Sequence, residues 1–284
     1  MGSVYFSRAP IVVRGGGDLA SGAVYRLQRA GFPVIVTELA QPLFVRRTVS
    51  YGEAIYSGSI RIDGVQACVI GSDQDIRKCW AEDVVPVVID PAGDRIPDLQ
   101  PAIVVDARMA KVNLGSTIYD APLVIGLGPG FTAGIDCHAV IETNRGHDLG
   151  RVIWNGSAEA DTGEPGVIEG KTRSRVLRAP TDGFVKSNVN IGDEVEEGRL
   201  VATVDGMPIE AAFNGVVRGM IHPSVAATMG MKIGDIDPRA NREACFTISD
   251  KSLAVGGGVL EAVLSAVQIR SYLEQRSHEA AKSV

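Results

Sequence analysis

The glycine-rich segment Arg14–Gly22 constrains the fold of this chain more than any other stretch. It follows the apolar run Pro10–Val13, which is short and rich in valine and isoleucine, as a buried parallel strand is. The apolar residues after it recur at the spacing of a helix. A strand, a glycine turn and a helix in this order make up the first unit of a dinucleotide-binding fold. The sequence therefore predicts an α/β domain with a ligand at the start of this helix.

The glycine string itself predicts an anion site. Gly15 and Gly17 take the first two positions of the pattern G-x-G-x-x-G/A, and Ala20 takes the third. The free amides at a helix start favour an anion such as phosphate. Asp18 departs from a simple phosphate cradle, because its carboxylate repels phosphate unless it binds a metal, a hydroxyl or a backbone amide. The candidate cofactor-binding residues of this segment are Gly15, Gly16, Gly17, Asp18, Ser21 and Gly22.

An acid and two arginines follow in positions that suit the same ligand. Glu38 ends the next predicted strand, 23 residues beyond Gly15, about where an acid meets a ribose hydroxyl. The segment 42–56 is predicted as a helix, and its adjacent Arg46 and Arg47 offer paired donors to phosphate or carboxylate. The alternative is a glycine turn kept for tight packing of strand and helix, with the charged side chains solvated.

A second glycine loop follows a later predicted strand. Short apolar runs at 67–70, 84–89, 102–105 and 123–125 predict further buried strands, and Gly126–Gly134 comes directly after the last of them. Two glycine loops at the carboxyl ends of strands in one sheet approach one crevice from two sides. This arrangement suits a pyrophosphate-bridged or pterin-like molecule. The candidate contacts of the second loop are Gly128, Pro129, Gly130 and Phe131.

Cys137 is the candidate catalytic residue, in a segment that also holds two histidines and several charged residues. A strand over 139–142 would point Cys137 to the same face as Ala139 and Ile141, and His138 to the other. This divergence, with no second cysteine pair, implies no zinc site, so no metal ligand is predicted. The alternative for Cys137 is a buried structural thiol.

Composition excludes several classes of protein. The net charge of −6 and the scattered basic residues argue against nucleic-acid binding. No apolar run reaches the roughly 18 residues that a membrane span requires. The N-terminus carries no secretory signal, so a cytoplasmic location is expected. The four cysteines form no C-x-x-C pair and are expected to be free thiols.

An internal repeat predicts a second domain. Gly183–Lys186 matches Gly215–Arg218 at an offset of 32 residues, which implies two copies of one small β unit closing on each other. The pattern resembles the barrel-sandwich fold of biotinyl and lipoyl carrier domains. The hairpin at 205–208, where such domains carry their cofactor on a lysine, has no lysine. A ligand-contacting or docking module is therefore expected rather than a swinging arm.

The predicted organisation has three parts. Residues 1–172 form a Rossmann-like, doubly wound parallel sheet domain, and 173–249 form the barrel-sandwich-like β module. A C-terminal helix within 250–284 reaches about Glu274 and packs back on the sheet domain. The glycines at 256–258 weaken such a helix and predict close packing against another backbone.

The motifs as a set resemble the YqeB family, and the resemblance covers nearly the whole chain. The matching segments are 14–22, Glu38-Leu39, Arg46-Arg47, 128–131, 142–147 and 232–239. The family is associated with selenium-dependent molybdenum hydroxylases and with maturation of their molybdenum cofactor. The resemblance implies an accessory protein that binds this cofactor, as its cytidine dinucleotide or as another nucleotide, and has a molybdenum hydroxylase as its protein partner.

On this hypothesis the glycine loops cradle a pyrophosphate, and Arg46, Arg47 or Arg145 neutralises its charge. Glu38 or Asp18 takes ribose or pterin hydrogen bonds, and Cys137 is the thiol to test for sulfur or selenium handling. Two alternatives stay open, an NAD-dependent oxidoreductase and a docking scaffold that binds no small molecule. The sequence also allows a homo-oligomer.

Overall fold

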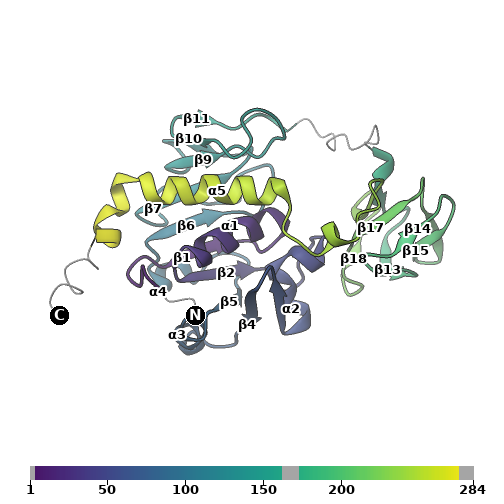
Figure 1. Cartoon of the computed structure of the whole chain (residues 1–284), viewed down its shortest axis with the longest axis horizontal. Helices are drawn as coiled ribbons and strands as arrows, with labels where there is room; N and C mark the ends of the chain where they lie inside the picture. The colour runs from purple at the N-terminus through teal and green to yellow at the C-terminus, as the bar shows by residue number, and fades with distance from the viewer. Residues whose placement is uncertain (1–3, 162–172, 275–284) are drawn as a thin grey trace.

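A nine-stranded mixed sheet dominates the computed structural model, which describes residues 4–161 and 173–274 (Figure 1). The strand order is β10-β9-β7-β6-β1-β2-β5-β4-β3, with antiparallel pairs at its two ends and parallel pairs between them. The predicted α/β class and the buried parallel strands are thus confirmed. The strands are β1 (Ile11–Arg14), β2 (Val34–Glu38), β3 (Ser59–Ile62), β4 (Val65–Val69), β5 (Val84–Ile89), β6 (Ile103–Asp106), β7 (Leu123–Leu127), β9 (Ala139–Ile141) and β10 (Val152–Ile153). A separate small pair joins β8 (Thr132–Ala133) and β11 (Gly156–Ser157).

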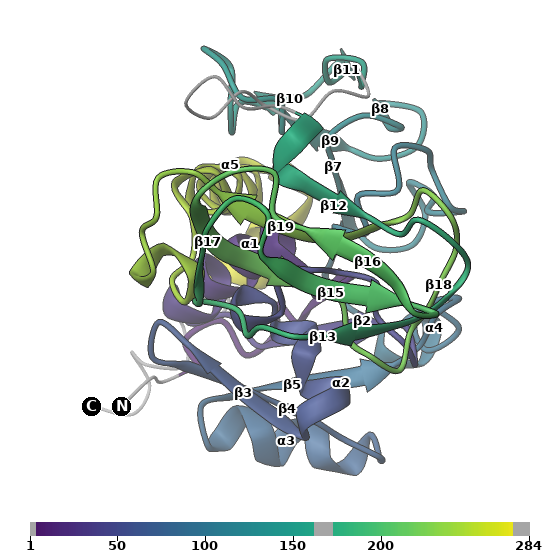
Figure 2. The same ribbon diagram turned by 90° about the vertical axis from the view of Figure 1, so that its right-hand side faces the viewer.

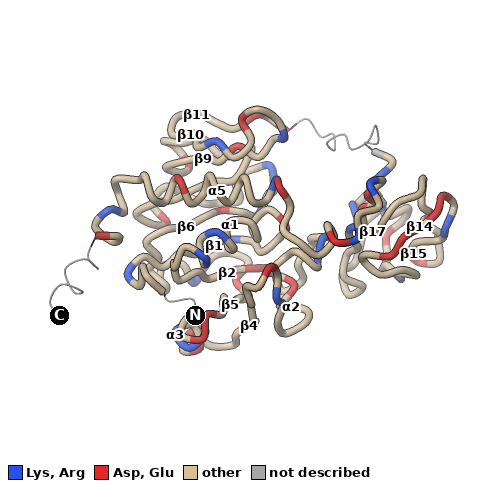
Figure 3. The backbone as a smooth tube through the Cα atoms, in the orientation of Figure 1, with Lys and Arg blue, Asp and Glu red and all other residues tan. Residues whose placement is uncertain are grey.

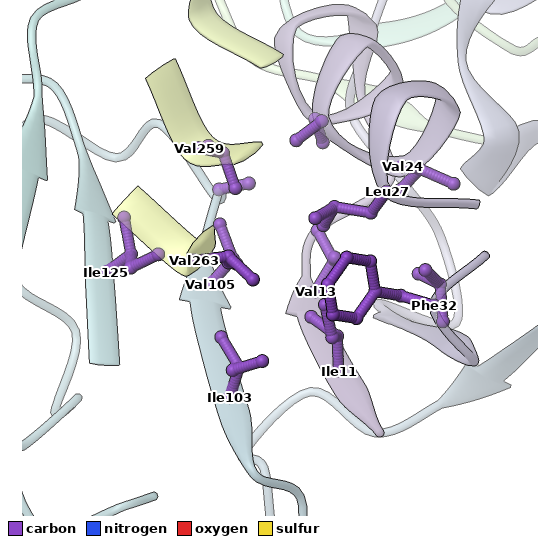
Figure 4. Close-up of a cluster of buried hydrophobic side chains, with 14 of the residues drawn as sticks. Ile11, Val13, Val24, Leu27, Phe32, Ile103, Val105, Ile125, Val259 and Val263 are labelled. Carbon is purple, nitrogen blue, oxygen red and sulfur yellow. The ribbon is translucent and has the colours of Figure 1, made fainter. Parts of the chain in front are cut away.

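Helices cover both faces of the sheet. Helices α1 (Asp18–Arg29) and α5 (Asp250–Ser265) lie side by side over one face, and α3 (Gln74–Ala81) and α4 (Ile96–Leu99) pack on the other. Successive strand residues point to opposite faces. Val13 therefore joins the core under α1 and α5 (Figure 4), whereas its neighbour Val12 joins the core under α3 and α4.

Glycines set how closely the two long helices approach each other. A Cβ on Gly22 of α1 would lie 1.9 Å from the carbonyl oxygen of Ser252 in α5. A Cβ on Gly256 would lie 2.2 Å from the carbonyl oxygen of Gly22, and one on Gly258 would lie 2.1 Å from that of Gly150. The close backbone packing predicted for the glycines of the C-terminal helix is therefore present at two of the three positions.

The helix predicted over 42–56 is wrong. The chain instead makes two 3-10 turns, η1 (Arg47–Val49) and η2 (Tyr51–Glu53), and one short helix, α2 (Ala54–Ser57). Tertiary hydrogen bonds replace helical ones here, because the Gly52 amide donates to the Gly16 carbonyl and the Tyr51 amide donates to the Ser21 hydroxyl. The segment therefore crosses the first glycine loop as a strap.

The C-terminal helix is present but not continuous to Glu274. It breaks at Ala266, whose backbone is extended, and the following turn, which begins as η5 (Val267–Ile269), is bent by 63° from α5. Within 4–161 and 173–274, no single helix is long and apolar enough to cross a membrane; only this bent pair passes that test, by combined length and composition.

The β module consists of two four-stranded antiparallel sheets, in the orders β12-β19-β17-β14 and β16-β15-β13-β18 (Figure 2). Strands β13 and β17, β14 and β18, and β15 and β19 each begin 32 residues apart, as the internal repeat requires. The halves are intertwined, because β13 pairs with β18 and β17 pairs with β14. The elements are η3 (Arg173–Arg175), β12 (Val176–Arg178), β13 (Gly183–Ser187), β14 (Glu194–Val195), β15 (Leu200–Val204), β16 (Met207–Glu210), β17 (Gly215–Met220), β18 (Ala226–Ala227), β19 (Lys232–Asp237) and η4 (Glu243–Cys245).

The strap holds the module against the sheet domain. Val45 is buried within the module's own apolar core, and its carbonyl accepts a 2.8 Å hydrogen bond from the Met220 amide of β17. Nearby, the rings of Tyr56 and His222 stack with centroids 3.8 Å apart. The carboxyl end of β1 and the strands β17 and β19 thus meet at one junction.

Candidate functional site

The first glycine loop is occupied by the chain's own groups. The Gly16 amide donates to the Glu38 carboxylate at 2.7 Å, and a Cβ on Gly16 would lie 2.6 Å from the Gly52 nitrogen. Burial raises the pKa of Glu38, and hydrogen bonds from the Gly16 and Leu39 amides act against that rise. This geometry matches the alternative explanation of the glycine string, which is tight packing, and leaves no cradle for a phosphate at Gly16.

The neighbouring predicted residues also serve packing. Ser21 donates its hydroxyl to the Gly17 carbonyl and accepts from the Tyr51 amide, both at 3.0 Å. Gly22 faces α5. A hydroxyl was one of the three partners predicted for Asp18, and its carboxylate accepts a 2.8 Å hydrogen bond from the Ser252 hydroxyl of α5. Its other oxygen accepts from Arg46 at 2.6 Å.

The two glycine loops contact the same segment of the chain, which follows β6. Gly15 faces the backbone of Ala107, and Gly130, with a φ of +105°, faces the backbone of Val112. Both loops therefore flank the segment after β6. Gly128 packs on Thr143, Phe131 is buried over Gly126, and Pro129 is half-buried.

Two acids at the carboxyl ends of strands, Asp90 after β5 and Asp106 in β6, are likewise satisfied locally. Asp90 accepts hydrogen bonds from the backbone amides at 93–95. Asp106 pairs with Arg108 and accepts from the Ser116 hydroxyl at 2.6 Å. Both carboxylates hold loops in place.

Cys137 is not activated in this structure. Its side chain is fully buried, and that burial raises the pKa of its thiol to about 12, so the nucleophilic thiolate is scarce. The Nδ1 atom of adjacent His138 is not free to act as a base for it, because this atom accepts a hydrogen bond from the Val124 amide. The predicted side-chain direction is also wrong. Strand β9 begins only at Ala139, and Cys137 lies in the core with Val140.

The three predicted arginines diverge. Arg46 pairs with Asp18, whereas Arg47 lies 3.2 Å from the Glu53 carboxylate. Arg145 binds Asp250 with two hydrogen bonds of 2.8 and 3.0 Å at an exposed site. Arg46 and Arg47 therefore do not form one clamp.

Around Asp18 and the neighbouring Asp235 and Asp237 the structure instead gathers a set of cations that we call the basic belt. Its members come from the strap, η3, β17, β19 and α5. They are Arg46, Arg175, Arg218, Lys232 and Lys251. Figure 3 shows basic and acidic segments together where the sheet domain meets the module. Three acids lie among them, namely Asp18, Asp235 and Asp237.

The electrostatics of the belt are unfavourable for its cations. Burial, and then the charge of Arg46, lowers the pKa of Arg218, although Asp237 lies 3.0 Å away. Lys232 reaches solvent, yet desolvation by the surrounding protein lowers its pKa. Desolvation, followed by repulsion from Lys111 and Arg145, lowers the pKa of Lys251. A bound anion would relieve this repulsion.

Buried donors in the belt also lack partners. Arg46 is 8% exposed and Arg218 is 9% exposed, and in both the Nε atom is buried without a hydrogen-bond acceptor. An unpaired buried donor costs about 1–3 kcal/mol. A guanidinium with such a free N–H can donate it to a phosphate or carboxylate oxygen.

Acid should weaken this junction through Asp237. Burial alone would raise its pKa, but hydrogen bonds from Arg239 and the charge of Arg218 outweigh burial and lower the pKa from 3.8 to about 2. A depressed carboxyl pKa contributes stability above pH 3.8 that is lost as the pH falls towards 2, here on the order of 2 kcal/mol. We expect Asp237→Asn to flatten the fall in unfolding free energy between pH 4 and pH 2, measured by urea denaturation. An equally steep fall in the variant would contradict this role.

Sequence reasoning identified Asp18 and Arg46 but missed the other four members of the belt. The one signal was the segment 232–239, which contributed to the family resemblance and holds Lys232, Asp235 and Asp237. Its role became visible only when the fold placed it against Asp18. Within the described ranges, no group of three or more His, Cys, Asp or Glu side chains is arranged to hold a metal.

Comparison with known proteins adds one sequence relative. The chain is 48% identical to the uncharacterized protein YqeB of Escherichia coli K12 over 254 residues, or 89% of its length. The chain is similar to YqeB. This similarity supports the resemblance to the YqeB family, although the chain spans only 47% of that relative's length. No family model matches the chain.

Solved structures give weaker likenesses. An aspartoacylase family protein from Mesorhizobium loti has a TM-score of 0.25 at 14% identity, with coverage of 81% of this chain and 84% of the other. The apo ectoine utilization protein EutE (DoeB) from Ruegeria pomeroyi has a TM-score of 0.24 at 11% identity, with coverage of 81% and 86%. TM-scores this low establish no common fold, and we base no argument on them.

Proposed function

We propose that the chain belongs to the YqeB family and acts in the cytoplasm as an accessory protein in the maturation of selenium-dependent molybdenum hydroxylases. The 48% identity to YqeB supports the family. The proposed ligand is the molybdenum cofactor, as its cytidine dinucleotide or as a related nucleotide, and the proposed protein partner is the hydroxylase.

The observation that carries the ligand proposal is the basic belt, with the buried and unpartnered Nε atoms of Arg46 and Arg218. A pyrophosphate supplies the oxygens that these donors lack and the negative charge that the belt's cations need. The first glycine loop does not fit this group, since Glu38 and Gly52 take its place. We therefore assign the phosphate site to the belt.

The sheet topology is consistent with this placement. Six of the parallel strands, β5-β2-β1-β6-β7-β9, follow the order 3-2-1-4-5-6 of the Rossmann fold, and the further parallel strand β4 lies outside β5. The six-strand order supports a Rossmann-like sheet domain. In such sheets ligands bind beyond the carboxyl ends of the strands, where the strand order reverses. Asp18 follows β1 at that reversal, and the belt surrounds it.

An NAD-dependent oxidoreductase is the second candidate, and the same strand order favours it. Its weakness is Glu38, whose two oxygens accept backbone amides of Gly16 and Leu39 instead of facing a ribose site. The third candidate is a docking scaffold that acts through the β module without a small ligand.

Thermal unfolding with NAD, NADP, CTP and molybdopterin cytosine dinucleotide tests these candidates. A ligand at 100 times its Kd stabilises by about 2.7 kcal/mol, which is worth roughly 5 to 10 °C in Tm here. We expect CTP or the molybdenum cofactor to raise the Tm, and Arg218→Gln to reduce that rise to about half or less at the same ligand concentration. A rise with NAD alone favours the oxidoreductase, and no rise with any ligand favours the scaffold.

A further inference from the structure

Two thiols outside the belt lie in contact. The Sγ atoms of Cys68 on β4 and Cys79 on α3 are 3.6 Å apart. Cys68 is half-buried, and Cys79 is 8% exposed. The other two cysteines, Cys137 and Cys245, are fully buried. Among the four thiols, only this pair combines a close partner with access to solvent at one member.

Both thiols stand on firmly held elements. Cys68 lies between two strands, opposite Ser59 of β3 and Pro86 of β5. Helix α3 is held by buried Ile76 and by Trp80, whose indole donates to the Val34 carbonyl at 3.0 Å. A disulfide has an S–S length of about 2.05 Å, so the two sulfur atoms need to approach by about 1.5 Å.

We propose that Cys68 and Cys79 form a reversible disulfide when the protein meets a hydroperoxide. The Cys68 thiolate attacks the peroxide, so that an S–O bond forms, the O–O bond breaks and hydroxide (or alkoxide) leaves. Cys68 is then a sulfenic acid. The Cys79 sulfur attacks the Cys68 sulfur, the S–S bond forms, and the sulfenic oxygen leaves as water with the Cys79 proton. Two thiols are oxidised and one peroxide is reduced.

The different surroundings of the two thiols assign their roles. Cys68 meets the oxidant because it is the more accessible. Burial, with the neighbouring Cys68, raises the pKa of Cys79 to about 12, so Cys79 stays protonated and does not compete for the peroxide. It acts as the resolving thiol, because the departing sulfenic oxygen beside it takes its proton as the S–S bond forms, and it protects Cys68 from further oxidation. The product ties α3 to β4, a constraint that is independent of the function proposed for the belt.

The test uses the full chain treated with hydrogen peroxide, then unfolded and alkylated with N-ethylmaleimide. We expect alkylation to fall from four thiols to two and a peptide linking Cys68 to Cys79 to appear in the mass spectrum, with dithiothreitol reversing both. Retention of all four thiols would overturn the proposal. So would Cys68 reaching the sulfinic acid while Cys79 stays alkylatable.

Single variants separate the two roles. Cys79→Ser should leave Cys68 as a sulfenic acid that dimedone traps, and Cys68→Ser should leave Cys79 reduced. Cys245→Ser is the matched control and should form the disulfide as the wild type does. Emission of Trp80, read in a Trp154→Phe background, should fall on oxidation of the wild-type pair and not in Cys79→Ser. Equal quenching in Cys79→Ser would contradict the disulfide.

Discussion

Gly22→Val is expected to lower the unfolding free energy by about 3 kcal/mol or more, measured by chemical denaturation. A Cβ at this position would lie 1.9 Å from the Ser252 carbonyl oxygen, so α1 and α5 must separate. Their contact also carries the Ser252–Asp18 hydrogen bond at 2.8 Å. The variant should therefore disturb the core under both helices and the orientation of Asp18.

Gly257→Ala is the matched control within α5. No heavy atom lies within 4 Å of the Cβ it would gain, so only helix propensity changes, and we expect stabilisation of about 0.5–1 kcal/mol. Similar stabilities for Gly22→Val and Gly257→Ala would show that the two helices do not pack through their glycines.

Arg218→Gln and Lys232→Gln are each expected to weaken binding of a phosphate-bearing ligand about 10- to 100-fold, which is the usual value of a hydrogen bond to a charged group. Titration calorimetry with inorganic pyrophosphate measures this loss directly. For Lys232→Gln, stability should change far less than affinity, because the folded protein already lowers the pKa of this cation and so disfavours its charged form. Arg218→Gln should also lose stability, because it removes the 3.0 Å ion pair with Asp237.

Lys186→Gln removes a lysine on the exposed side of β13, outside the belt, and should leave pyrophosphate affinity unchanged. If it weakened binding as much as Lys232→Gln does, the attraction would come from general charge and not from the belt. Unchanged affinity in both Arg218→Gln and Lys232→Gln would show that the belt does not bind the phosphate.

The parts of the fold that local pattern determines could be predicted from the sequence. Strands β5, β6 and β7 are short runs of branched apolar residues because both faces of the sheet are covered. The sequence of the β module repeats because its two halves form equivalent strands with equivalent pairings. The strap over 42–56 could not be predicted. Backbone amides of the strap donate hydrogen bonds to Gly16 and Ser21, and the spacing of residues within the segment does not indicate such distant partners.

The candidate site could be predicted only in part. The glycine pattern led to Asp18, and the adjacent arginines led to Arg46. The glycine pattern also suggested a phosphate cradle that Glu38 and Gly52 fill. A glycine required for close packing looks the same in sequence as one required for a ligand. The rest of the belt comes from positions more than a hundred residues away. Docking of the module brings Arg175, Arg218 and Lys232 to the junction, and packing of α5 on α1 brings Lys251.

A crystal structure of the protein with pyrophosphate tests the central claim most directly, because it locates the anion. We predict phosphate oxygens within hydrogen-bond distance of the Nε atoms of Arg46 and Arg218, with Lys232 beside them. Pyrophosphate bound at the Gly15–Gly17 amides, with Glu38 displaced from Gly16, would contradict the claim and restore the glycine loop as the ligand site.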